Sequence, residues 1–324
     1  MNYRKFGTTD LQVSEIGFGA WAIGGPAEVG GIPIGWGNSD DTQSVLAIRQ
    51  ALDRGINFFD TADFYGLGHS EELLGKELAT ENDVIIASKV GHRKSPENTI
   101  VLDYTYDYII SACESSLRRL GRDHIDYYQL HTAKVADLQN EAGIRAMDKL
   151  TKDGKIRYWG VSLNTFNPFP EADYLIKHKL GQGFQLVLNI INQKALPIVT
   201  TASENKFGVI ARMPLQFGLL TGKFSKDTTF EKSDHRSFRL TPLILEKSLK
   251  ALEPIWDMTE KYQTTKLGLS LSYILSYPGV STVIPGLRTA EQVRQNADHV
   301  VQLADEDRVF IESLFEEKFD ELLA

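Results

Sequence analysis

The chain has little cysteine, no long apolar run and no excess of positive charge. Its 324 residues include one cysteine, Cys113, so no disulfide can form within the chain, and such a composition suits a reducing compartment. The first ten residues, MNYRKFGTTD, have no apolar signal core, and no run reaches the roughly 18 apolar residues that a membrane span needs. We therefore expect a cytoplasmic protein with no membrane partner.

Charge and composition indicate which class of protein and which partners to expect. The formal net charge is -8 at pH 7, which argues against nucleic acid as a partner but is compatible with a local basic pocket for a phosphate. Apolar residues make up 42% of the chain, enough for a packed core. Cys113 has helical spacing with Ile109, Leu117 and Leu120, which indicates a core position rather than a reactive thiol.

Short apolar runs alternate with helical patterns along almost the whole chain. Most of the runs are continuously apolar, as expected for strands that are buried on both faces. The eight expected strands are Glu15–Gly19, Asn57–Asp60, Val84–Lys89, Ile125–His131, Tyr158–Ser162, Gln185–Asn189, Val209–Arg212 and Thr282–Ile284.

Helical patterns lie between these strands. Asp40–Arg54 begins with capping residues and is followed by Gly55, a residue typical of left-handed helix ends. The alternation predicts an α/β protein, a single (β/α)8 TIM barrel domain over residues 1–324. A doubly wound sheet is the alternative, but no GxGxxG turn follows the first strand. The other expected helices are Thr105–Leu120, Asn140–Asp153, Pro197–Asn205, Thr241–Tyr262 and Thr289–Val300.

Two segments interrupt the alternation. Gly24–Asn38 is rich in glycine and follows the first strand. The segment between the seventh and eighth strands is too long for one helix, and it contains Gly218–Lys223 (GLLTGK) and the charged stretch Ser225–Arg239. Insertions of this length in a compact domain are usually functional lids or disordered loops.

Polar residues recur at the carboxyl ends of the expected strands. Asp60 ends FFD, Lys89 ends VIIASK, His131 ends YYQLH and Ser162 ends WGVS. Taken singly, each has an ordinary explanation, such as a turn-forming Asp, a Lys that reaches solvent or a hydrogen-bonded core His. In a (β/α) barrel, however, all strand ends meet at one mouth, where the active site lies. The joint pattern therefore favours a catalytic site.

The chemistry of these residue types explains why they would lie together with Tyr65, which follows Asp60 on a loop. A free phenol has a pKa near 10, and lowering it by about two units takes about 2.7 kcal/mol. An ammonium about 4 Å away in a partly wet cleft can supply that much. Lys89 would be this ammonium, Asp60 its counter-ion, and His131 a hydrogen-bond partner for a substrate oxygen. A carbonyl protonated in this way also needs a hydride, which a nicotinamide cofactor supplies.

The same segments resemble the aldo-keto reductase family, nearly from end to end. The specific pair is Phe59–Gly66 (FDTADFYG) with Ser70–Leu78 (SEELLGKEL), and GFGAW, IASK, GKIRYWGVS and PLQFGLLTGK add to it. The chain is most similar to bacterial members related to inositol-operon and general stress reductases. The resemblance implies a catalytic tetrad with Tyr65 as proton donor, Lys89 and Asp60 as its tuning pair, and His131 orienting the carbonyl.

The resemblance also implies a site for NADP(H). Ser162 and Gln185 match two ligands of the nicotinamide carboxamide, but Leu163 stands where the family usually has Asn, and Asn164 follows it. Arg212 replaces the tyrosine that often stacks on the nicotinamide. Trp21 and Phe64 match the substrate pocket. The remaining matched cofactor positions are Gly19, Trp21, Pro214, Leu215, Gly218, Leu219, Lys223, Gly286, Arg288, Gln292 and Asn296.

These matches predict an enzyme that reduces aldehydes or ketones to alcohols, or runs in reverse on a sugar or polyol. Arg288 is the candidate partner of a 2′-phosphate, which favours NADPH over NADH; a solvated arginine at a helix start is the alternative. Two other functions stay open. One is an NADPH-binding regulatory subunit of an ion channel, and the other is an isomerase or aldolase with Lys89 as a Schiff base. No metal site is expected, and nothing in the sequence specifies an oligomeric state.

Overall fold

The structure, a computed structural model, describes residues 1–35, 37, 39–231, 234 and 236–323. Trp36 and Asn38 of the glycine-rich segment, and three residues of the charged stretch, lie outside the described residues. The three residues of the charged stretch are Lys232, Ser233 and His235. Ala324, the last residue of the expected domain, also lies outside the described residues.

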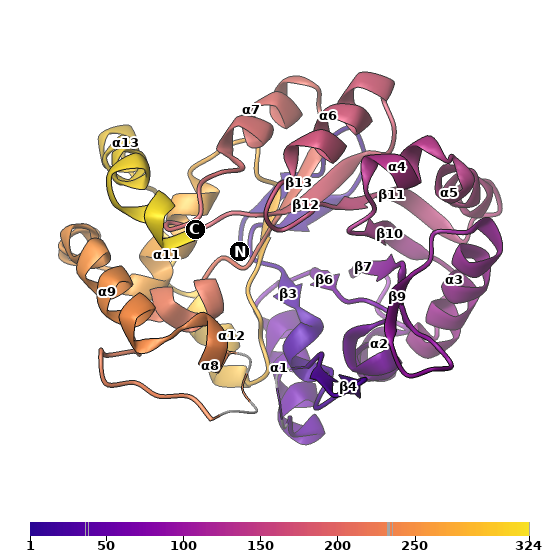
Figure 1. Cartoon of the computed structure of the whole chain (residues 1–324), viewed down its shortest axis with the longest axis horizontal. Helices are drawn as coiled ribbons and strands as arrows, with labels where there is room; N and C mark the ends of the chain where they lie inside the picture. The colour runs from indigo at the N-terminus through magenta and orange to yellow at the C-terminus, as the bar shows by residue number, and fades with distance from the viewer. Residues whose placement is uncertain (36, 38, 232–233, 235, 324) are drawn as a thin grey trace.

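Eight parallel strands form a nearly closed barrel with helices around it, as predicted (Figure 1). Parallel bridges from Ile16 to Val283 and from Gly19 to Gly286 join the first strand to the last. The strands, in sheet order, are β3 (Phe18–Gly19), β6 (Phe58–Asp60), β7 (Ile85–Val90), β10 (Ile125–His131), β11 (Ile156–Ser162), β12 (Gly183–Val187), β13 (Gly208–Arg212) and β14 (Thr282–Ile284).

The helices cover the outside of the barrel, and two of them, α1 and α3, begin or end at the expected signals. Asp40 caps α1 (Asp41–Asp53) by accepting hydrogen bonds from the amides of Thr42 and Gln43. Gly121 ends α3 (Tyr106–Leu120) with a φ of 63°, and Cys113 of this helix is buried, as predicted. The other helices between strands are α2 (His69–Leu78), α4 (Val135–Gln139), α5 (Ala142–Lys152), α6 (Phe169–His178), α7 (Leu196–Glu204) and α11 (Lys266–Leu275).

The long insertion lies between β13 and β14, also as predicted. The single helix expected over Thr241–Tyr262 is wrong: α9 (Pro242–Trp256) ends soon after Pro254, which lacks the amide hydrogen that a helix interior requires. Figure 1 shows α9 on the side of the barrel opposite α3 and α5. The other elements of the insertion and the C-terminal region are α8 (Arg236–Arg239), α10 (Met258–Lys261), α12 (Ala290–Ala297) and α13 (Asp305–Leu314).

An N-terminal hairpin closes the end of the barrel at which the strands begin. It consists of β1 (Tyr3–Lys5) and β2 (Gln12–Ser14), paired antiparallel. Phe6 is fully buried against the barrel interior, and a Cβ at Gly208 would lie 2.6 Å from its ring. Glycine at 208 therefore makes room for the aromatic ring. The buried residues packed together here are Phe6, Leu11, Val13, Phe58, Ile85, Ala87, Tyr127, Ile210 and Ile284.

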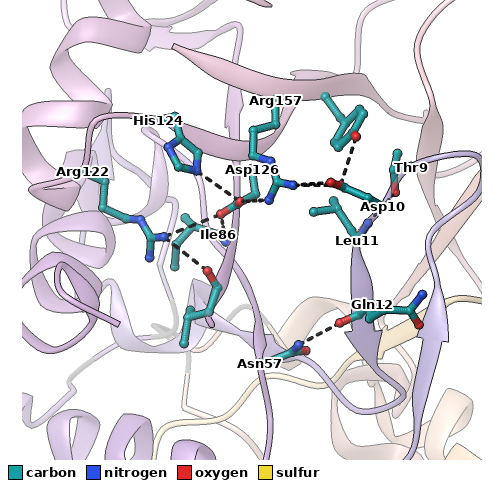
Figure 2. A network of polar contacts seen from close by, with 12 residues as sticks. Thr9, Asp10, Leu11, Gln12, Asn57, Ile86, Arg122, His124, Asp126 and Arg157 are labelled. Carbon is teal, nitrogen blue, oxygen red and sulfur yellow. Dashed lines mark hydrogen bonds and ion pairs between the residues drawn. The ribbon is translucent and has the colours of Figure 1, made fainter. Parts of the chain in front are cut away.

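Polar contacts fasten the same end (Figure 2). Asp126, at the start of β10, is 2% exposed and accepts hydrogen bonds of 2.9 Å from the amide of Ile86 and from Arg157. Arg157 also donates to Asp10 of the hairpin at 2.8 Å. The guanidinium thus links the hairpin to the strands, which leaves the opposite mouth free for a site.

Two further hairpins, which the sequence patterns did not predict, stand at that mouth. They are β4 (Glu28–Val29) with β5 (Ile32–Pro33), and β8 (His92–Lys94) with β9 (Ile100–Leu102). A Cβ at Gly30 in the first hairpin would lie 2.7 Å from the carbonyl oxygen of Asn98 in the second, so the two hairpins touch. Among the described residues, no helix is both long enough and apolar enough to cross a bilayer.

Candidate active site

Strand register brings the predicted polar residues to one level of the barrel. Asp60 at the end of β6 pairs with Gly19 of β3. On the far side of β7, His131 of β10 pairs with Ser162 of β11, and Ser162 pairs with Gln185 of β12. Because parallel strands end at a common rim, side chains separated by many residues in sequence become neighbours there.

Lys89 lies at the centre of the tetrad and is fully buried. Its ammonium donates to Asp60 Oδ1 at 2.5 Å, to the carbonyl oxygen of Thr61 at 2.8 Å and to the phenolic oxygen of Tyr65 at 3.2 Å. Burial by itself would lower the pKa of Lys89, but Asp60 and Tyr65 together outweigh burial and the pKa is raised. The ammonium is therefore charged and positioned beside the phenol.

Asp60 is held by more than Lys89. Its second oxygen, Oδ2, accepts hydrogen bonds from Gln185 at 2.8 Å and from Gln129 at 3.2 Å. Gln129 is fully buried in β10, opposite Lys89 in the register. Gln129 was not among the predicted site residues: an amide within an apolar strand stands out, but its contact with Asp60 cannot be read from the sequence. A buried carboxylate with both oxygens bonded is fixed in orientation.

His131 faces the same space, with its ring edge-on to that of Tyr65 at a centroid distance of 6.1 Å. Its Nδ1 is buried and has no hydrogen-bond partner in the described part of the chain. Burial lowers the pKa of His131 well below its usual value, and the neighbouring charges of His92, Lys89 and Arg212 act in the same direction. A neutral ring with Nδ1 enclosed has Nε2 available to the cavity, and a proton there could be donated to a substrate oxygen.

The SEELLG motif (Ser70–Gly75) lies on α2 and contacts elements that hold the tetrad. Glu71 of α2 is fully buried, accepts from Ser88 of β7 at 2.5 Å and is paired with Arg119 of α3 at 2.7 Å. Ser70 donates to the carbonyl oxygen of Ala20 at 2.8 Å. The motif therefore ties α2 to the strand that contains Lys89, which is a structural role.

A cavity of about 880 Å³ opens beside the tetrad. Asp60, Tyr65 and His131 line it, and Lys89 reaches it through Tyr65. The structure also brings every predicted cofactor and substrate-pocket residue to this cavity. These are Gly19, Trp21, Phe64, Ser162, Gln185, Arg212, Pro214, Leu215, Gly218, Leu219, Lys223, Gly286, Arg288, Gln292 and Asn296.

The polar atoms of this lining fit a dinucleotide. Asn296 is buried and its Oδ1 is an acceptor without a partner within the described ranges. The guanidinium of Arg288 has no hydrogen bond or ion pair to any described residue, and only its backbone amide is bonded, to Gln292 at 3.0 Å. Unused acceptors and cations along an elongated cavity are what phosphates and an adenine amino group require.

Two predicted cofactor contacts differ in detail from the expected arrangement. The Arg212 guanidinium donates to the carbonyl oxygen of Leu163 at 3.2 Å and to Thr165 Oγ1 at 2.9 Å, so it holds the loop after β11. Gln185 uses its NH2 group on Asp60 and has only its Oε1 left to accept from a carboxamide.

Leu163 and Asn164 do not replace the missing asparagine ligand. Leu163 is fully buried, and Asn164 Oδ1 accepts from the amides of Phe166 and Asn167 at 2.9 and 3.1 Å. Asn164 therefore shapes a turn, and neither residue lines the cavity. The residues of this loop that do line it are Thr165 and Phe166, which the sequence patterns did not single out.

Comparison with known proteins agrees with this geometry. The model of the aldo/keto reductase family matches residues 15–315. The aldo-keto reductase YhdN of Bacillus subtilis (strain 168) is 32% identical over 305 residues, which cover 90% of this chain and 87% of that protein. The structure of the glycerol dehydrogenase AKR11B4 from Gluconobacter oxydans superposes with a TM-score of 0.83 at 31% identity, covering 98% of this chain and 96% of that one.

A more distant relative has a different role. A probable voltage-gated potassium channel subunit beta of Arabidopsis thaliana is 27% identical over 327 residues, which cover 91% of this chain and 90% of that protein. The enzymes of the family are oxidoreductases that act on small carbonyl compounds with nicotinamide cofactors. The family match, the barrel and the relatives agree, and the chain belongs to the aldo/keto reductase family.

Proposed function

We propose that this protein is an NADP(H)-dependent reductase of aldehydes and ketones, with Tyr65 as the proton donor. In reverse it would catalyse the oxidation of a sugar or polyol by the oxidised nicotinamide. The observation that carries the proposal is the position of the Lys89 ammonium, 2.5 Å from Asp60 Oδ1 and 3.2 Å from the Tyr65 oxygen. A phenol beside a fixed ammonium can release its proton because the phenolate that forms is stabilised at once.

Each member of the tetrad has one task in this proposal. Tyr65 gives its proton to the substrate oxygen, and Lys89 stabilises the phenolate. Asp60 keeps the ammonium charged and in place, because a buried ammonium without a counter-ion would be costly. His131 donates from Nε2 to the same oxygen and so orients the carbonyl. When bound, the nicotinamide supplies the hydride that no side chain can supply.

The cofactor would lie along the cavity from the tetrad to α12. In this arrangement Ser162 and Gln185 Oε1 would bind the carboxamide. The pyrophosphate would lie along Pro214, Leu215, Gly218, Leu219 and Lys223, and the adenine near Asn296, all of which line the cavity. The preference for NADPH rests on Arg288, whose guanidinium suits the dianionic 2′-phosphate.

The two other functions are less well supported. A Schiff-base mechanism needs a neutral lysine, whereas the Asp60 carboxylate raises the pKa of Lys89. A regulatory channel subunit would need no acid catalyst, yet the complete tetrad is assembled at the cavity. We place the protein in the cytoplasm, since its single thiol, Cys113, is buried and suits a reducing compartment.

A panel of aldehydes, ketones, sugars and polyols, each tested with NADPH and with NADH, examines the proposal directly. Oxidation of the reduced nicotinamide is followed by its absorbance. Turnover of at least one carbonyl with NADPH is expected. Tight NADPH binding without turnover of any carbonyl, together with a tetrameric size on a gel-filtration column, would favour the channel-subunit function instead.

A further inference from the structure

No described residue gives the ring of His131 the hydrogen bond that usually orients a catalytic histidine. In most such sites one ring nitrogen is bonded to a carboxylate, a carbonyl or water, and this bond sets the ring plane and the tautomer. Here Nδ1 is buried with no partner in the described part of the chain. Tyr104 donates to the backbone oxygen of His131 at 2.6 Å, which fixes the main chain but not the ring.

A second imidazole occupies one face of this ring. The ring of His92 is stacked on that of His131 at a centroid distance of 4.3 Å, with an interplanar angle of 8°. His92 is itself fixed on two sides. Its Nε2 is 2.8 Å from Thr132 Oγ1, and Phe64 packs against it edge-on at 5.7 Å. A ring held in this way restricts rotation of the imidazole that it covers.

The backbone on both sides of the stack adopts conformations that put these residues in place. Gly91, the residue before His92, has a φ of 132°, and a Cβ at this position would lie 2.3 Å from the Tyr104 ring. Only glycine therefore fits at position 91. Thr132 has a φ of 63°, which is unfavourable for a β-branched residue. Its amide donates to the carbonyl oxygen of Ser162 at 2.8 Å. Strain of this kind is retained at functional sites.

We propose that His92 is the positioning residue of His131. By stacking, it holds the His131 ring so that Nε2 points into the cavity toward the substrate oxygen, the task that a hydrogen bond to Nδ1 performs elsewhere. The bond between His92 Nε2 and Thr132 Oγ1 adds to the packing of Phe64 in fixing the stacked ring. The inference rests on the proposed carbonyl reduction, in which His131 orients the substrate oxygen.

Two variants separate stacking from the other contributions of His92. His92→Ala removes the stacked ring, and we expect kcat to fall about 10- to 100-fold, the usual effect of losing a supporting partner. The KM for the carbonyl should change less than kcat, and the Kd for NADPH should not change. His92→Phe keeps a flat ring and should recover most of the lost kcat. Melting temperatures of both variants show whether the fold is intact.

Unchanged kcat in His92→Ala would overturn the inference. So would a loss in His92→Ala that His92→Phe does not recover. A wild-type protein that turns over no carbonyl would refute the proposed function instead. The role of His92 can still be tested in that case, by a measurement that needs no turnover.

That measurement is the tautomer of the His131 ring in the cofactor-free protein, from nitrogen NMR with signals assigned through His131→Gln. The wild type should show one neutral tautomer with the proton on Nε2, and His92→Ala should show a mixture. A mixture already in the wild type would contradict the role of His92, whether or not the protein is a reductase.

Discussion

The ammonium of Lys89 lies 3.2 Å from the phenolic oxygen of Tyr65, although Lys89 is fully buried at the end of β7 and Tyr65 belongs to the turn after β6. The same ammonium is also 4.7 Å from the centre of the Tyr65 ring. The Lys89 ammonium thus contacts both the oxygen and the ring of the Tyr65 phenol. In the proposed mechanism, this contact stabilises the negative charge that the phenol acquires when it gives up its proton.

The buried pair of Lys89 and Asp60 can be tested by a double-mutant cycle. Lys89→Met leaves the carboxylate unpaired, so we expect the free energy of unfolding to drop by about 3–5 kcal/mol and turnover to be lost. Adding Asp60→Asn removes the unpaired charge and should restore much of the stability but none of the activity. Denaturant unfolding and steady-state assays measure both. If Lys89→Met and the double variant unfolded with the same free energy, the carboxylate and the ammonium would not be coupled.

The pH dependence of stability tests the burial of His92, whose pKa is lowered from 6.5 to about 4. Above pH 6.5 the histidine is neutral in both folded and unfolded chains. As the pH falls from 6.5 toward 4, the unfolded chain binds a proton that the folded protein excludes. The free energy of unfolding should therefore decrease by up to roughly 3 kcal/mol over this window.

His92→Phe is the matched control for this dependence, because it keeps a ring but cannot bind a proton. Its stability should fall less steeply between pH 6.5 and 4 than that of the wild type. Curves that run parallel through the window would mean that His92 titrates normally in the folded protein.

Arg288→Ala tests the cofactor preference. If the guanidinium binds the 2′-phosphate, the Kd for NADPH should rise about tenfold, the effect of one lost charge-assisted hydrogen bond, while the Kd for NADH stays the same. Arg294→Ala is a suitable control because Arg294 lies on α12, the helix that follows Arg288, but is paired with Glu291 and does not line the cavity. An equal loss of affinity for both cofactors would assign Arg288 another role.

The polar network at the opposite end of the barrel predicts an effect on stability alone. Asp126→Ala should lower the free energy of unfolding by about 3 kcal/mol, because the buried carboxylate holds Arg157 and the amide of Ile86. Asp10→Ala removes the exposed partner of the same arginine and should cost less than about 1 kcal/mol. Both variants should keep the wild-type kcat. A reduced kcat in either would contradict the separation of the two ends.

The barrel could be predicted because most of its strands are continuous apolar runs that alternate with helical patterns. The helices that were missed have weaker signals. α11 is buried along its whole length and so shows no amphipathic period. α6 begins among prolines and asparagines, and α13 begins with three acidic residues, which resemble loop sequence. Hairpins of two or three residues per strand, such as β4–β5, leave no periodic pattern at all.

The tetrad was predictable for a similar reason, since strand ends in a barrel share one rim. Gln129 and His92 were not, because their roles depend on distances between side chains. Gln129 contributes by bonding Asp60, and His92 by stacking on a ring 39 residues away along the chain, at a spacing that no motif specifies. The bond of Arg212 to the loop after β11 depends equally on three-dimensional arrangement.

The most direct test of the whole account is the turnover of Tyr65→Phe beside its affinity for NADPH. Removing one oxygen atom leaves the ring between Trp21 and His131 but takes away the proton donor. We predict that kcat falls by at least about 10²-fold, as for other lost general acids, while the Kd for NADPH is unchanged. Tyr3→Phe, at the far end of the barrel, is the control and should behave as the wild type. Unchanged turnover in Tyr65→Phe would contradict the assignment of this site.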